Sequence, residues 1–122
     1  RYQITVEAVA QYAPEHSAPD ENRYVFAYQI TITNSGDCPA KLVRRHWTIR
    51  DADGCVDEVQ GDGVIGEQPM LAPGQSFEYA SGCALTTPFG SMHGSYRMRA
   101  EDGTEFEADI PEFFLVGPRV LH

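Results

Sequence analysis

Residues 24–33 read YVFAYQITIT, and this stretch decides the fold. Large apolar residues stand at every second position from Tyr24 to Ile32, whereas Gln29, Thr31 and Thr33 stand between them. Side chains of a β-strand point to opposite faces in turn, so the stretch predicts a strand with one face in a core and the other in solvent. The sequence NSGD at 34–37 ends it, because these residues favour turns.

The same alternation recurs along the chain, and helical periodicity is nearly absent. The Asp-Gly pairs at 53–54 and 102–103 predict hairpin turns, since Gly and Asp tolerate a positive φ. Seven or eight short strands predict an all-β sandwich or barrel. The expected strands are 4–10, 24–33, about 41–51, 55–59, around 77–79, 96–100, 106–110 and 113–116, with a long connection over 61–74.

In the strand predicted at 41–51, Val43, Trp47 and Ile49 share one parity and are expected to point inward. Arg45 shares that parity although it is charged. We therefore expect Arg45 to lie at the end of the strand or beside a bulge.

Length and composition restrict the function. The 122 residues fit one domain spanning 1–122, and 42% apolar residues are enough for a core. No apolar run approaches the ~18 residues of a membrane span, and we expect no signal peptide. A net charge of −9 argues against nucleic acid or an anionic membrane as partner.

The three cysteines, Cys38, Cys55 and Cys83, form no CxxC pair, so a zinc ribbon or a disulfide framework is not expected. Buried free thiols in a reducing cytoplasm are the preferred interpretation. The histidines have no ligand partner at metal-site spacing, and no serine or cysteine has the surroundings of a nucleophile. We predict no metal site, no cofactor and no catalytic residue.

Several segments together resemble the ApaG family. They are RHWTI at 45–49, GDGVIGEQP at 61–69, LAPGQSFEY at 71–79, GSMHGSYRM at 90–98 and FEADIPEFFL at 106–115. The resemblance implies a fibronectin type III-like, immunoglobulin-like β-sandwich. It implies a domain found alone in bacteria and as a protein-binding module in larger eukaryotic proteins. It also implies a genetic association with cobalt resistance and magnesium efflux, and it supplies no catalytic residue.

Gly61, Gly63 and Gly66 complete a literal GxGxxG motif. In a dinucleotide site such glycines let the backbone approach a pyrophosphate, and a following helix directs its N-terminus at the charge. Here Pro69 and Pro73 lie where that helix would have to run. The preferred interpretation is a loop whose glycines serve positive φ or close packing, and a phosphate loop remains the alternative.

Basic residues concentrate in the strand at 41–51, where Arg44, His46 and Arg50 share the face opposite Trp47. Arg97 and Arg99 have the outward parity of a later strand, and Glu105, Glu107 and Asp109 have that of the next. One interpretation is a cross-strand charge ladder. The other leaves Arg44, His46 and Arg50 unmatched, as a small-anion site or a docking patch for an acidic partner.

The C-terminal run Phe113-Phe114-Leu115 cannot place all its side chains on one face of a strand. Either the segment is buried on both faces or Phe114 is exposed. An exposed Phe114 beside a sheet edge would contact a partner peptide or a second copy of the chain.

The leading hypothesis is a noncatalytic protein–protein interaction module in the cytoplasm. Its expected contacts are the Gly61–Gly66 loop, the face of Arg44, His46 and Arg50, and the segment around Phe114. The alternative is a small-anion or nucleotide-phosphate binding protein that uses the same glycine loop with Arg44 and His46. A third hypothesis, a cation-responsive regulator, predicts a carboxylate or histidine cluster that only the folded chain can reveal.

Overall fold

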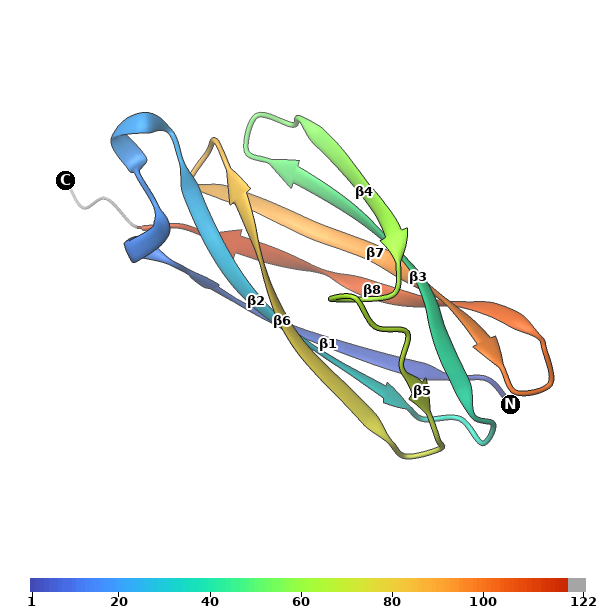
Figure 1. Cartoon of the computed structure of the whole chain (residues 1–122). Helices are drawn as coiled ribbons and strands as arrows, with labels where there is room; N and C mark the ends of the chain where they lie inside the picture. The colour runs from blue at the N-terminus through green and yellow to red at the C-terminus, as the bar shows by residue number, and fades with distance from the viewer. Residues whose placement is uncertain (119–122) are drawn as a thin grey trace.

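Two antiparallel sheets pack face to face in the computed structural model, which describes residues 1–118 (Figure 1). The first sheet has the order β1-β2-β6, from β1 (Ile4–Tyr12), β2 (Tyr24–Asn34) and β6 (Ser76–Leu85). The second has the order β4-β3-β7-β8, with β5 paired to β3; its strands are β3 (Ala40–Asp51), β4 (Val56–Asp62), β5 (Met70–Leu71), β7 (Phe89–Ala100) and β8 (Glu105–Val116). This arrangement confirms the predicted all-β sandwich.

The alternation of β2 sets the core. Phe26, Ile30 and Ile32 are fully buried between the sheets, and the alternate residues face outward. Trp47 and Tyr96 of the opposite sheet belong to the same buried core cluster as these residues of β2. The segment before β2 forms two 3-10 turns, η1 (Pro14–His16) and η2 (Pro19–Glu21), and none of the helices within residues 1–118 has the length and apolarity of a membrane span.

Two irregularities interrupt the second sheet. Between β3 and β7 the register shifts at Val43, and between β7 and β8 it shifts where Pro111 and Glu112 oppose His93. A residue inserted into one strand reverses the parity that follows it. Leu42 is therefore the fully buried residue, the prediction that Val43 points into the core is wrong, and Arg45 shares the inward face of Trp47.

The return strand after Asp53-Gly54 is longer than predicted. It runs over Val56–Asp62 instead of 55–59, so Gly61 belongs to a strand rather than to a loop. The expected connection over 61–74 also contains β5, which pairs with the start of β3. Cys55 is exposed, which corrects the expectation of a buried thiol, and the three cysteines are free.

The hydroxyls of Tyr79 on β6 and Tyr96 on β7 lie 2.6 Å apart and link the two sheets inside the core. Burial, which disfavours a phenolate, raises the pKa of Tyr79 from 10.0 to about 12. Burial likewise raises the pKa of Tyr96 far above its usual value. Both groups therefore remain protonated at neutral pH.

Stability is expected to fall in alkali because of this pair. Above pH 10 the unfolded chain releases phenolic protons that the folded chain retains until about pH 12 or beyond. The contribution of these two tyrosines to the free energy of unfolding is therefore fully present below pH 10. Above pH 10 it decreases by about 1.4 kcal/mol for each pH unit and each tyrosine. Urea unfolding at pH 9, 10 and 11 measures the slope. A Tyr79→Phe/Tyr96→Phe double variant serves as control, and an unchanged slope in that variant would contradict the assignment.

Candidate functional site

The candidate site lies on the outer face of the five-stranded sheet, the face turned away from the sheet β1-β2-β6. Register places Arg50 beside Ser91 and Ser91 beside Phe114, so these side chains form one row across β3, β7 and β8. A second row contains Arg44 and Arg97 with Glu107. Arg44, His46, Arg50 and Phe114, which the sequence predicted from two different arguments, therefore share one surface.

Acidic residues of the neighbouring strands pair with most of the cations on this face. On one side, Arg97 lies 3.2 Å from Glu107, and Arg99 lies 2.8 Å from Glu105. The Arg99 guanidinium holds the pKa of Glu105 below its usual value. These pairs form the cross-strand ladder, and because they are exposed to solvent each contributes little to stability.

The edge strand β4 supplies acids to the other side of the same face. His46 Nε2 lies 2.9 Å from Glu58 Oε1, and Arg44 Nε lies 3.9 Å from Asp62 Oδ1. The sequence hypothesis that left Arg44 and His46 unmatched did not anticipate β4 as their neighbour. Within the part of the chain that the structure describes, Arg50 has no ion pair.

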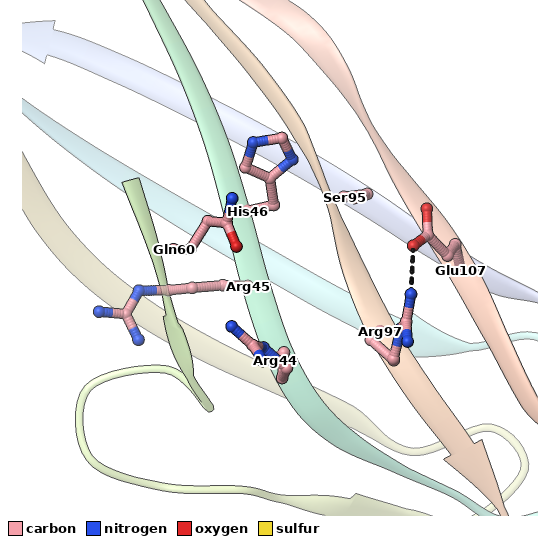
Figure 2. Close-up of a pocket in the computed structure, with 7 residues that line it drawn as sticks. All are labelled: Arg44, Arg45, His46, Gln60, Ser95, Arg97 and Glu107. Carbon is pink, nitrogen blue, oxygen red and sulfur yellow. Dashed lines mark hydrogen bonds and ion pairs between the residues drawn. The ribbon is translucent and has the colours of Figure 1, made fainter. Parts of the chain in front are cut away.

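A shallow depression of about 290 Å³ lies in the middle of this face (Figure 2). Arg44 and His46 line it from β3, and Ser95 and Arg97 line it from β7. Figure 2 shows Arg45 directed away from Arg97 and Glu107. Arg45, Gln60 and Glu107 complete its lining, and sequence reasoning missed Gln60 and Ser95 because only the register of the strands places them here.

The end of the face beyond Arg50 is apolar. Phe114 is 65% exposed, and the paired residues Phe89 and Val116 are 46% and 52% exposed. Phe113 and Leu115 point inward instead, so the structure realises the alternative in which Phe114 is exposed. We call Phe89, Phe114 and Val116 the apolar end; three large apolar side chains gathered on one sheet surface are typical of a contact site.

The glycine motif forms a hairpin. Val64 and Glu67 exchange two backbone hydrogen bonds of 2.8 and 2.9 Å, and the two residues between them, Ile65 and Gly66, have φ of 43° and 80°. Two positive φ values in a two-residue loop define a type I′ turn. The N–H of Gly63 donates to Val43 O. The N–H groups of Gly63, Val64 and Glu67 are already bonded within the chain, so a phosphate cradle at this loop would lack these three donors.

Arg45 explains the first glycine of the motif. Its Nη1 donates to the carbonyls of Asp62 and Gly63 at 3.0 Å, and its guanidinium lies against Gly61. A Cβ at Gly61 would lie 2.8 Å from Nη1 and Nη2. Gly61 therefore makes room for a half-buried arginine, which is the close packing that the preferred interpretation expected. The structure does not bring the glycines together with Arg44 and His46 as a phosphate site.

Residues 1–118 contain no group of three or more His, Cys, Asp or Glu side chains that could hold a metal ion. Burial, with a smaller effect of Asp57, raises the pKa of the Cys83 thiol to about 11, so this thiol is protonated at neutral pH.

A family model described as the ApaG domain matches residues 14–100. The chain belongs to the ApaG family. Protein ApaG of Aromatoleum aromaticum is 63% identical over 122 residues, covering 100% of this chain and 96% of that protein. A crystal structure described as the putative ApaA protein of Bordetella pertussis has 50% identity and a TM-score of 0.94, covering 98% of this chain and 97% of that one.

Fold alone connects this ApaG-family chain to more distant proteins. A structure of a Bacteroides uniformis β-glucuronidase 2 mutant matches with a TM-score of 0.58 at 13% identity, covering 90% of this chain and 13% of that one. The two-sheet sandwich thus has immunoglobulin-like and fibronectin type III-like domains among its structural neighbours.

Proposed function

We propose that this protein is a noncatalytic protein-binding module and that the outer face of the five-stranded sheet is its contact surface. The observation that carries the proposal is the apolar end beside Arg50, where three exposed apolar side chains adjoin a cation without an ion pair in the described residues. An aromatic anchor with a nearby arginine is the composition of interface hot spots.

The partner that fits this surface is another protein that presents an apolar residue next to an acidic one. Phe114 would enter a pocket of the partner, and Arg50 would pair with its carboxylate. The chain is otherwise strongly acidic, so Arg50 would also reject cationic partners. A second copy of the chain is the other candidate partner, and the experiment below distinguishes the two.

A photo-crosslinking amino acid at position 114 is expected to capture the partner in bacterial cells. The control places the same residue at Val9, which is 70% exposed on the sheet that does not carry the proposed surface. The crosslink should appear at position 114 and not at position 9. Arg50→Glu should reduce it at least about tenfold, because a charge-assisted contact becomes a like-charge one.

The mass of the crosslinked species separates a heterologous partner from a dimer of this chain. A product at both positions, or one at position 114 that Arg50→Glu leaves unchanged, would contradict the proposed surface. Circular dichroism should report the same unfolding midpoint for Arg50→Glu and the unmodified chain, since Arg50 is exposed.

Binding of a small anion in the depression at Arg44, His46 and Arg97 is the second candidate. What favours it is the convergence of these side chains with Ser95 around one hollow. It ranks second because each of the three already lies within 4 Å of a carboxylate, which an anion would have to displace. If this second candidate is right, pyrophosphate added to the crosslinking sample should bind at Arg44 and His46 only. The crosslink at position 114 should then remain unchanged.

We also propose that the protein works in the cytoplasm. The three free cysteines support this location, because a reducing compartment preserves thiols that include the exposed Cys55.

A further inference from the structure

A second cavity, of about 380 Å³, lies between the two sheets on the side of the edge strands β4 and β6. Its walls are mainly inward side chains of β2, β3 and β6, and Arg45 lies between it and the depression on the outer face, since this residue lines both. Three aromatic residues, Tyr28, Trp47 and Tyr79, form much of its surface. A mainly apolar cavity with a few polar groups, at the small end of known ligand sites, is the usual form of a small-molecule pocket.

Arg45 gives this cavity a positive charge. Its Nη1 is held by two backbone carbonyls, which neutralise no charge, while Nε and Nη2 make no hydrogen bond within residues 1–118. No Asp or Glu is found among the described residues that line the cavity, although the chain carries a net charge of −9. Asp57 exerts a coulombic effect at the Cys83 end of the cavity. A fixed guanidinium with free donors is suited to a carboxylate.

The indole N–H of the aromatic wall is also available. Trp47 is only 3% exposed, and no hydrogen bond among residues 1–118 involves its indole N–H. The same residues contain no fully enclosed side-chain nitrogen or oxygen without a partner, so this N–H reaches open space, and Trp47 lines the cavity. The hydroxyl of Tyr79 is already paired with that of Tyr96, so Tyr79 offers the cavity its ring.

The mouth of the cavity is built from residues that would otherwise be hard to explain. Ser81 shares the inward parity of Tyr79 on β6 and yet is exposed, because no strand covers it. Ile65 is 55% exposed and has a φ of 43°, a conformation that β-branched residues rarely adopt. Backbone strain of this kind is found at ligand sites, and Ile65 lines this one.

We propose that the cavity binds a small aromatic carboxylate, with the ring against Trp47 and Tyr79 and the carboxylate on Arg45. The aromatic walls favour a planar apolar body, and the lone cation selects an anionic group over a neutral one. This site is distinct from the proposed protein-binding contact, because neither Arg50 nor the apolar end is among the residues that line the cavity.

The test is a titration of the ¹⁵N-labelled protein followed by NMR, with benzoate, phenylacetate and 3-phenylpropionate as probes. The chain has one tryptophan, so the indole N–H of Trp47 gives a single signal at the cavity wall. At least one probe should shift this signal saturably. Phenylacetamide, which keeps the ring without the charge, should bind at least about tenfold more weakly than phenylacetate, and acetate should leave the signal in place.

Two variants act on the site in different ways. Arg45→Met should weaken binding at least about tenfold, since it removes the charge-assisted donors. Ser81→Phe should abolish the shift by filling the mouth, while it leaves the contacts of Arg45 with the hairpin intact. If Arg45→Met does not fold, Ser81→Phe therefore still tests whether the carboxylate binds in the cavity. Arg99→Met removes one positive charge at the end of the other face and should bind as the unmodified chain does.

Three outcomes would overturn the proposal. They are the absence of a saturable shift with all three carboxylates up to roughly 10 mM, equal affinity for phenylacetamide and phenylacetate, and unchanged binding by Ser81→Phe. None of these bears on the crosslink at position 114, so the two proposals fail separately.

Discussion

Replacing Trp47 by alanine is expected to lower the free energy of unfolding by about 3–5 kcal/mol, the cost of removing a large buried aromatic side chain. The indole packs against Tyr28, Tyr96 and Phe113, with ring centroids 5.7, 6.4 and 5.9 Å away. All three contacts are edge-to-face, a geometry that stabilises beyond the buried area alone. Urea unfolding followed by far-UV circular dichroism measures the loss, because the variant has no tryptophan fluorescence.

Phe114→Ala is the matched control for this measurement. It also removes a large aromatic ring, but from a side chain that is 65% exposed, so its effect should stay within about 0.5 kcal/mol. Comparable losses in both variants would mean that Trp47 does not hold the two sheets together. A loss confined to Trp47→Ala supports the core assignment and shows that Phe114 is free to serve a partner.

The sequence was sufficient for the fold because a period-two pattern with one apolar face has few other solutions. The alternation in β2 and the Asp-Gly turns at 53–54 and 102–103 each correspond to an observed element. Positions beyond an irregularity were not predictable in the same way. The bulge at Val43 was indicated only by the charge of Arg45 two residues later, and it places Leu42 instead of Val43 in the core.

The candidate site was predictable only in part. Parity alone placed Arg44, His46 and Arg50 on one face, and the apolar run at 113–115 required either burial on both sides or an exposed Phe114. The acids that pair with Arg44 and His46 come from β4, which continues to Asp62 where the sequence predicted a strand that ends at residue 59. The inward parity of Arg45 was attributed to a strand end or a bulge, and the pattern gave no sign that this arginine also lines an interior cavity.

Gly94→Ala is expected to destabilise the protein by at least about 2 kcal/mol, although it adds a single methyl group. Gly94 lies on β7 opposite Trp47, and its φ is not positive, so the cost is steric rather than conformational. A Cβ at this position would lie 2.0 Å from the carbonyl oxygen of His46 and 3.1 Å from the Cα of Trp47. Backbone atoms in a paired strand cannot rotate away, so β3 and β7 must separate at the point where the outer face and the core meet.

Gly82→Ala on β6 provides the comparison, because Gly82 is also a strand glycine without a positive φ. A Cβ there would meet only the carbonyl oxygen of Phe26, at an ordinary contact of 3.4 Å. Its unfolding midpoint should remain the same or rise slightly, since alanine lowers the entropy of the unfolded chain. Equal urea midpoints for the two variants would contradict the tight contact between β3 and β7. The expected difference instead makes Gly94 the position where the spacing of these strands, and with it the placement of His46 and Trp47, is fixed.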